Sequence, residues 1–269
     1  MTNKFDDLVI GKLLGAEKVG VYTVAYEISN LPTTELIFPI SRAVFPGFSI
    51  LAKDIETLKQ HFFRIQGVIF LVVIPVGVLI SICSESLVAV LLGPQWKNAV
   101  PVVAILALSG SVRACGALNG SVFIAMGDPK TTAIIGSIRL FMLIPLLLWF
   151  ISNEGIVGAA KSHLIVSLLM FFPIFILLCQ RMQESILNII YIMFRPLLGS
   201  ICMIVAAHFF ILPLVDSFPH ISRLLWLLLS SVAVYILTIG IAWWITGNDE
   251  SAELKIYQLI KERTVGKLM

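Results

Sequence analysis

The stretch AVPVVAILALSGSVRACGALNGSVFIAM, residues 99–126, is long and apolar enough to cross a lipid bilayer, yet it carries Arg113 near its middle. A spanning helix needs about 20 largely apolar residues. An ionisable side chain at mid-membrane is costly, so it normally faces a protein interior or a wet cavity. The stretch therefore predicts a membrane protein with a polar interior, and we interpret that interior as a transport path.

The composition of the whole chain supports a membrane protein. Of its 269 residues, 58% are hydrophobic and 13% are charged, and the mean hydropathy is +0.98. Soluble domains are about 45–50% apolar and about 25% charged. The excess cannot be buried in one water-soluble core. The net charge of +3 is small and the chain has no long Lys/Arg block, so we expect no nucleic-acid partner.

Seven segments meet the length and polarity of a membrane span. Helices are expected, because lipid cannot satisfy the open edges of strands. The fold class is therefore predicted as an all-α multi-pass membrane protein. An eighth piece, residues 5–15, reads as the last turns of a helix whose start is missing. The seven segments are 20–46, 62–83, 98–126, 131–151, 156–179, 196–215 and 223–245.

Loop charges predict the orientation through the excess of Lys and Arg in cytoplasmic loops. Placing the 47–61 loop in the cytoplasm puts eleven basic residues on that side and five on the other, and it puts the C-terminus inside. The tail 248–269 is then a cytoplasmic tail, either a short helix on the membrane surface or a solvated segment. The cytoplasmic set is Lys53, Lys59, Arg64, Lys130, Arg139, Arg181, Arg195, Lys255, Lys261, Arg263 and Lys267, and the opposite set is Lys12, Lys18, Lys97, Lys161 and Arg223.

The segment 20–46 carries a polar face that lipid would not tolerate. At 100° per residue its polar side chains fall within an arc of about 140°. Two interpretations stay open: buried ion pairs between helices, or the wall of a cavity. Pro32, Pro39 and Pro46 also lie near one another around the axis and predict a bent helix. The polar residues are Thr23, Glu27, Asn30, Thr34, Glu35, Ser41 and Arg42, of which Glu27, Asn30, Glu35 and Arg42 are candidates for the substrate path.

Arg113 needs a partner at its own depth. Glu35 is the carboxylate at matching depth in the complete segments, and Asp6 and Asp7 are rivals, so we predict an ion pair or a water-bridged contact with one of the three. Gly116 and Gly120 form a small-xxx-small pair that predicts close helix packing beside Arg113.

Arg42 and Arg139 are predicted near the cytoplasmic ends of their helices. Their guanidinium groups match phosphate oxygens and could receive an anionic headgroup. Alternatively they extend to lipid phosphates as simple anchors. His163 is open to two interpretations as well, a proton-exchanging group or a packed helix–helix residue.

No catalytic motif is present in the sequence. It has no phosphate-binding loop of the G-x-x-x-x-G-K-[ST] type and no H-E-x-x-H metal site. The four cysteines form no Cys-x-x-Cys pair and are expected to be free buried thiols. The polar residues are dispersed over many helices, which suits translocation better than catalysis. We expect no enzyme activity, no cofactor and no metal.

Several short stretches carry a resemblance to a known family. In their order and spacing they resemble the polysaccharide transporter family of oligosaccharide flippases, in the superfamily of multidrug and toxin extruders and the lipid II flippase. The resemblance covers roughly residues 5–180, while residues 181–269 match only by hydropathy. The stretches are DDLVIGKLLG at 6–15, VGVY at 19–22, RAVFP at 42–46, LLGPQW at 91–96, ILAL at 105–108 and AMG at 125–127.

The resemblance implies both a fold and a function. The fold would be part of a flippase, with residues 1–180 as one helical lobe (about helices 7–12), 181–247 as two extra helices and 248–269 as the tail. The function would be to move undecaprenyl-pyrophosphate-linked oligosaccharide repeat units across the bacterial cytoplasmic membrane for cell-surface polysaccharide synthesis. Implied partners are this lipid-linked oligosaccharide, membrane lipids, a polysaccharide polymerase and glycosyltransferases.

Two alternatives remain open at the level of sequence. A cation or drug antiporter of the same superfamily would line its cavity with carboxylates, and Arg42, Arg113 and Arg139 argue against it. A truncated, non-transporting remnant is favoured by the absence of a first lobe, which the implied V-shaped cavity needs.

Overall fold

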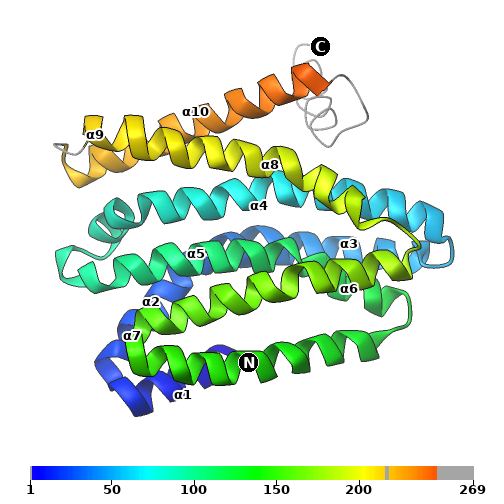
Figure 1. Ribbon diagram of the computed structural model, residues 1–269, viewed down its shortest axis with the longest axis horizontal. Coiled ribbons are helices and arrows are strands. Elements are labelled where there is room, and N and C mark those ends of the chain that lie inside the picture. The colour runs from blue at the N-terminus through cyan, green and yellow to red at the C-terminus, as the bar shows by residue number, and fades with distance from the viewer. Residues whose placement is uncertain (1, 216–217, 247–269) are drawn as a thin grey trace.

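A computed structural model describes residues 2–215 and 218–246, and in these ranges the chain is helical with no strand (Figure 1). The predicted tail 248–269 lies outside them. The elements are α1 (Thr2–Leu14), α2 (Ala16–Pro32), the π-helix η1 (Thr33–Ile37), α3 (Phe38–Leu51), α4 (Ile55–Leu91), the 3-10 helix η2 (Pro94–Ala99), α5 (Val100–Cys115), α6 (Ala117–Ala125), α7 (Pro129–Arg181), α8 (Ile186–Ala206), the π-helix η3 (Ala207–Ile211), α9 (Leu212–Val215) and α10 (His220–Thr246).

Six helical stretches in the described part are long and apolar enough to cross a membrane, which confirms the all-α multi-pass class. The sequence predicted seven segments. The difference lies in α7, whose 53 residues contain both 131–151 and 156–179. The six stretches are Thr33–Leu51, Ile55–Leu91, Pro94–Ala125, Pro129–Arg181, Ile186–Val215 and His220–Ile245.

α7 is a hairpin of two helical arms rather than one long rod (Figure 1). The helix breaks at Gly155, whose φ of 62° and ψ of −138° are strained for any residue with a Cβ. Past the break the second arm returns along the first. The Ser162 hydroxyl donates to the Leu146 carbonyl at 3.2 Å. Two of the expected spans are therefore present, joined by one glycine.

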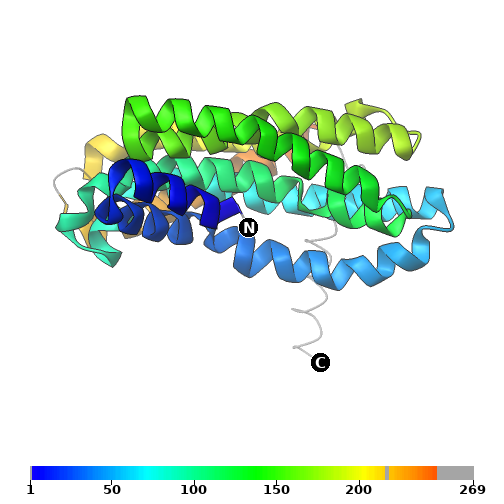
Figure 2. The ribbon, with the colours of Figure 1, turned by 90° about the horizontal axis from the view of Figure 1, so that it is seen from below.

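The predicted bend in segment 20–46 is also present. α2 and α3 run in different directions in Figure 1, and in Figure 2 α3 follows one edge of the bundle. The π-helix η1 joins them, between Pro32 and Pro39. Proline lacks an N–H to continue the hydrogen-bond ladder, and a π turn carries extra residues per turn, so both change the direction and the facing of the following helix.

Two apolar cores lie at different levels of the bundle. One contains Tyr22, Val103, Leu106 and Ile151, and it joins α1, α2, α5 and the turn of α7. The other contains phenylalanines from α3, α4, α6 and α7, together with residues of α8. Its fully buried phenylalanines are Phe48, Phe62, Phe70, Phe123 and Phe175.

Polar side chains occupy the level between these cores. On α5 the polar residues Ser109 and Arg113 fall between Leu106 of one core and Ala114 of the other. α2 with η1 passes from one core to the other in the same way, with Ser29, Asn30 and Thr33 between Ala25 and Ile37. The second arm of α7 does so as well, with Ser162, His163 and Ser167 between Ala160 and Phe175. We call these residues, together with Tyr26, Asn119, Arg139 and Asp6, the polar layer.

The close approach of α2 to α5 occurs at Gly110. A Cβ built there would lie 3.4 Å from the Ser29 carbonyl oxygen and 3.5 Å from Asn30 Oδ1. The sequence predicted such an approach at Gly116 and Gly120 instead. At Gly116 the nearest atoms belong to Arg113 and Asn119 of the same segment, because the helix is interrupted there between α5 and α6.

A substitution at Gly158 tests the α7 hairpin. A Cβ at this position would lie 2.1 Å from the Phe150 carbonyl oxygen on the opposite arm. We expect Gly158→Ala to lower the free energy of unfolding by about 1–3 kcal/mol, as overpacking does. The measurement is unfolding of the purified protein in detergent. Gly136→Ala is the control, because nothing lies within 4 Å of its Cβ on the same helix. Equal stability of the two variants would contradict the hairpin.

The cap of α7 predicts an acid-sensitive contact. Asp128 accepts hydrogen bonds from the Thr131 hydroxyl and backbone N–H and pairs with Arg181 at 2.9 Å. The Thr131 bonds, then Arg181, lower the pKa of Asp128. The pKa of Asp128 is thus lower in the folded protein than in the unfolded chain. Its contribution to the free energy of unfolding is therefore complete above the unfolded pKa, and it is lost as the pH falls through the folded pKa. The stability difference between wild type and Asp128→Asn, measured by unfolding in detergent, should therefore shrink below about pH 4. A difference constant with pH would argue against this contact.

Candidate functional site

Arg113 stands at the end of α5, one turn before the helix is interrupted at Gly116. Its guanidinium donates to Asn30 Oδ1 on α2 and lies over the Tyr26 ring, 5.6 Å from the centroid. The Asn30 amide is oriented by its own hydrogen bond, from Nδ2 to the Tyr26 carbonyl at 2.8 Å. A cation is favoured at a helix C-terminus and over an aromatic face, so both features help to hold Arg113 in an apolar surrounding.

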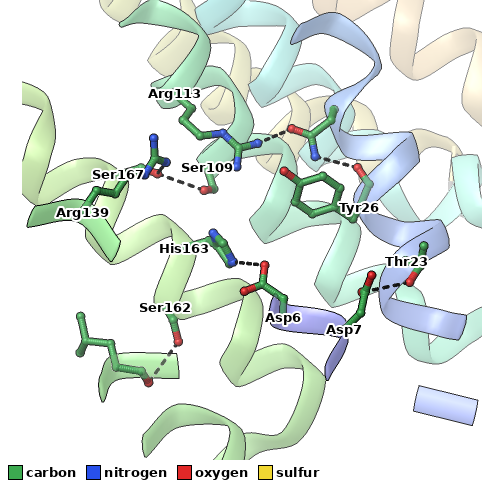
Figure 3. Close-up of polar contacts among 12 residues, drawn as sticks. Asp6, Asp7, Thr23, Tyr26, Ser109, Arg113, Arg139, Ser162, His163 and Ser167 are labelled. Atoms are coloured by element: carbon green, nitrogen blue, oxygen red, sulfur yellow. Dashed lines mark hydrogen bonds and ion pairs between the residues drawn. The ribbon is translucent and has the colours of Figure 1, made fainter. Parts of the chain in front are cut away.

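Arg139 reaches the same level from the first arm of α7 (Figure 3). Its Nη2 donates to Ser167 Oγ on the second arm at 3.3 Å. Ser167 in turn lies 3.3 Å from Ser109 Oγ on α5, so a chain of hydroxyls connects α7 with α5. The hairpin at Gly155 is what brings Arg139 and Ser167 together, because it folds the two arms against each other.

The two arginines line one cavity of about 70 Å³, which we call the arginine cavity. Asn119 also lines it and is 2% exposed, with neither amide atom bonded to any described residue. Within the described ranges neither arginine pairs with a carboxylate. Two positive groups and an unpartnered amide around a small hollow are suited to an anion or to water. The cavity is lined by Val112, Arg113, Gly116, Asn119, Arg139, Ser167, Met170, Phe171, Ile174 and Phe175.

The carboxylates expected to pair with Arg113 have other partners or positions. Asp6 lies 2.8 Å from His163 Nε2, and Asp7 accepts from the Thr23 hydroxyl at 3.3 Å (Figure 3). Glu35 is exposed. The expected ion pair is thus replaced by the hydrogen bond to Asn30, a neutral residue of the predicted polar face. Five residues separate Asn30 from Glu35, which is about 140° around a helix, so the two side chains lie at opposite edges of the predicted polar arc and only Asn30 contacts Arg113.

The other candidates for the substrate path lie apart from the arginine cavity. Glu27 on α2 and Arg42 on α3 are both exposed, like Glu35. Of the six candidates, the structure therefore brings together Asn30, Arg113 and Arg139 and leaves three on an outer face of α2, η1 and α3. Sequence reasoning missed Tyr26, Asn119 and Ser167. A polar residue inside an apolar span was the available signal for Asn119 and Ser167, whereas Tyr26 carried none.

The described residues offer no obvious metal site. No group of three or more His, Cys, Asp or Glu side chains gathers among them. Asp6 and His163 contact each other, but two such side chains are fewer than a metal site in a protein uses.

Several of the known proteins that this chain matches are named for polysaccharide biosynthesis. Residues 1–101 match a family model described as polysaccharide biosynthesis protein. The chain is 24% identical over 200 residues to the lipopolysaccharide biosynthesis protein WzxC of Escherichia coli K12, covering 74% of this chain and 38% of that protein. It is 26% identical over 217 residues to a membrane protein encoded in the cps region of Klebsiella pneumoniae, covering 81% and 41%.

A further relative is named for transport. The succinoglycan biosynthesis transport protein ExoT of Rhizobium meliloti is 28% identical over 105 residues, which cover 39% of this chain and 21% of that protein. The chain is similar to these proteins over part of its length, and the family model covers residues 1–101. The chain spans about two fifths of the length of the first two relatives. The membrane-spanning helices and the polysaccharide names agree with the resemblance on which the sequence interpretation depended.

Replacing Asn119 tests whether its unpartnered amide, which lines the arginine cavity, lowers the stability of the folded protein. A buried polar group without a partner costs about 1–3 kcal/mol, so Asn119→Leu should raise the free energy of unfolding by a similar amount. Unfolding in detergent measures it. Asn30→Leu is the matched comparison and should lower stability, because Asn30 makes two hydrogen bonds that a leucine cannot replace. A loss of stability in Asn119→Leu would mean that Asn119 has a partner.

Proposed function

We propose that this chain forms the C-terminal part of a flippase that moves undecaprenyl-pyrophosphate-linked oligosaccharide repeat units from the cytoplasmic to the periplasmic leaflet. The arginine cavity is the observation that carries the proposal. A pyrophosphate is a compact anion whose oxygens match the fork of a guanidinium group. Arg113 and Arg139 offer two such groups inside a bundle of apolar helices.

The sugar needs a different place from the phosphate. A cavity of about 70 Å³ has room for a few waters or for one of the two phosphate groups of a pyrophosphate, whose other phosphate would lie at the cavity mouth, and it has no room for an oligosaccharide. The exposed Glu27, Glu35 and Arg42 supply a hydrophilic face for the sugar. In this arrangement the lipid tail stays in the bilayer while the headgroup follows the polar face.

A comparison of two weakly buried spans supports this polar face. Within the most apolar windows of Thr33–Leu51 and of α10, only 12% and 11% of residues are buried inside the protein. α10 carries Arg223 near its start and otherwise no Asp, Glu, Lys or Arg, which suits contact with lipid. The span Thr33–Leu51 carries Glu35 and Arg42. Because charged side chains within a span normally face protein or water, this side of the molecule faces a partner lobe or a hydrated space.

The remaining assignments follow from the same proposal. In this proposal residues 1–180 form a lobe and 181–247 add two helices, and the loop charges favour a cytoplasmic C-terminus at the inner membrane of a bacterium. The chain acts without catalysis of its own, together with polymerase and glycosyltransferases that make and use the substrate. A cation or drug antiporter is disfavoured, because two unpaired guanidinium groups repel a cationic substrate from the arginine cavity.

Binding of inorganic pyrophosphate to the purified chain in lipid nanodiscs tests the site. We expect Arg113→Gln and Arg139→Gln each to weaken binding about tenfold to a hundredfold, the loss expected from a charge-assisted hydrogen bond. Arg64→Gln is the control, because Arg64 is an exposed residue near the start of α4. Isothermal calorimetry gives the affinities. Equal losses in all three variants would show general charge attraction and contradict the site.

A second measurement separates binding from transport. The chain would be expressed in a bacterium that lacks its own repeat-unit flippase, and surface polysaccharide would be measured. Restoration by the wild type but not by Arg113→Gln supports transport by this chain. Pyrophosphate binding without restoration would support the alternative of a non-transporting remnant.

A further inference from the structure

A second polar pair lies in the same layer but outside the arginine cavity. Asp6 on α1 is fully buried and His163 on the second arm of α7 is 2% exposed. Asp6 Oδ2 lies 2.8 Å from His163 Nε2, and Figure 3 shows the pair between α1 and α7. We propose that Asp6 and His163 form a proton-binding site whose occupancy is linked to anion binding in the arginine cavity.

The contact between Asp6 and His163 leaves hydrogen-bonding atoms without partners, which a purely structural contact would not be expected to do. Asp6 Oδ1 is buried without a hydrogen-bond partner among the described residues. The Tyr22 hydroxyl, on the helix packed against α1, is buried and equally unpartnered there. Most buried polar atoms in proteins have partners, and an exception calls for a functional explanation. The open carboxylate oxygen of Asp6, in a residue that already contacts His163, gives a proton a second place to bind.

Charge explains why this pair would exchange a proton. With one proton between them Asp6 and His163 are neutral as a unit, and without it they leave one negative charge in an apolar interior. Histidine is the side chain that changes charge in the physiological pH range. The pair can therefore alternate between a neutral and a negative state without any other rearrangement.

The charged and titratable groups around the pair are each held elsewhere. On α1, Asp7 accepts from Thr23, and on α2 the rings of Tyr22 and Tyr26 lie 6.3 Å apart. On α5, Arg113 donates to Asn30, and on α7, Arg139 donates to Ser167 while Lys161 pairs with Glu154 at 2.5 Å.

Two helices connect this pair to the arginine cavity. On α7, His163 and Ser167 are four residues apart and thus on one face, and Ser167 holds Arg139 and lines the cavity. On α2, Tyr22, Tyr26 and Asn30 repeat at the same spacing, and Arg113 contacts the last two. A charge that appears at the pair is therefore felt at both arginines through a medium of low dielectric constant.

The sign of the linkage follows from Coulomb attraction. A deprotonated, negative pair attracts the arginines and opposes an anion in the cavity, whereas a neutral pair does not. Protonation should strengthen anion binding, and by reciprocity anion binding should take up a proton. The linkage rests on the proposed function, because it needs an anion in the cavity. The proton-binding site itself does not.

Calorimetry of inorganic pyrophosphate binding in nanodiscs, repeated in two buffers of different ionisation enthalpy, counts the protons exchanged. We expect proton uptake in the wild type, none in Asp6→Asn or His163→Gln, and wild-type uptake in Asp7→Asn. Asp7 is the matched control, because it neighbours Asp6 but bonds to Thr23. Binding without proton exchange in the wild type would overturn the proposal whatever the variants do.

Infrared difference spectroscopy between about pH 5 and about pH 8, the range of histidine titration, tests the pair with no anion present. We expect an imidazole band that disappears in His163→Gln, is altered in Asp6→Asn and is unchanged in Asp7→Asn. With this band present and no pyrophosphate bound, the proposed function fails and the proton-binding site stands without its linkage. With pyrophosphate bound and no such band, the site is overturned and the proposed function stands.

Discussion

The structure depends on placing polar side chains in an apolar bundle so that helices, not lipid, surround them. Three helical segments cross the polar layer at the same level: α2 with η1, α5 and α7. Several hydroxyls and amides there bond to backbone carbonyls, as Ser29 does to the Val103 carbonyl at 3.1 Å. Because lipid offers no hydrogen bonds, these contacts fix how the helices can be packed, and the two apolar cores occupy the space on either side.

The interruptions of the helices belong to the same layer. η1 follows Asn30, and the break at Gly116 follows Arg113. Gln66 Nε2 donates to the Cys115 carbonyl at 2.8 Å, which satisfies a backbone group that the break leaves free. Irregular helix inside a membrane is tolerated where protein or a cavity surrounds it. In many transporters such broken helices lie at the binding site, and here the break at Gly116 lines the arginine cavity.

The sequence predicted the class of protein and the level of Arg113 because both depend on local properties, hydropathy and segment length. It did not predict the partner of Arg113. Asn30 and Glu35 lie at the two edges of a predicted polar arc about 140° wide, and helical spacing alone does not tell which edge faces α5. The contact between Asp6 and His163 joins residues 157 positions apart, so it depends on how α1 packs against α7. The one-residue turn at Gly155 was missed because nothing marks it as tighter than a loop.

Arg113 and Arg139 have hydrogen bonds but no carboxylate partner among the described residues, and this arrangement sets the stability of the fold against its capacity to bind an anion. A partly buried guanidinium group without a carboxylate partner retains part of its desolvation penalty, which an apolar residue of similar volume would avoid. The hydrogen bonds to Asn30 and Ser167 offset part of that penalty, but they leave the positive charge in place. A bound anion would neutralise it, and any ligand that binds the folded state stabilises that state. In the proposed function, the same two arginines that lower the stability of the bundle would give a phosphate its affinity, and an amide partner for Arg113 leaves its positive charge available to that anion.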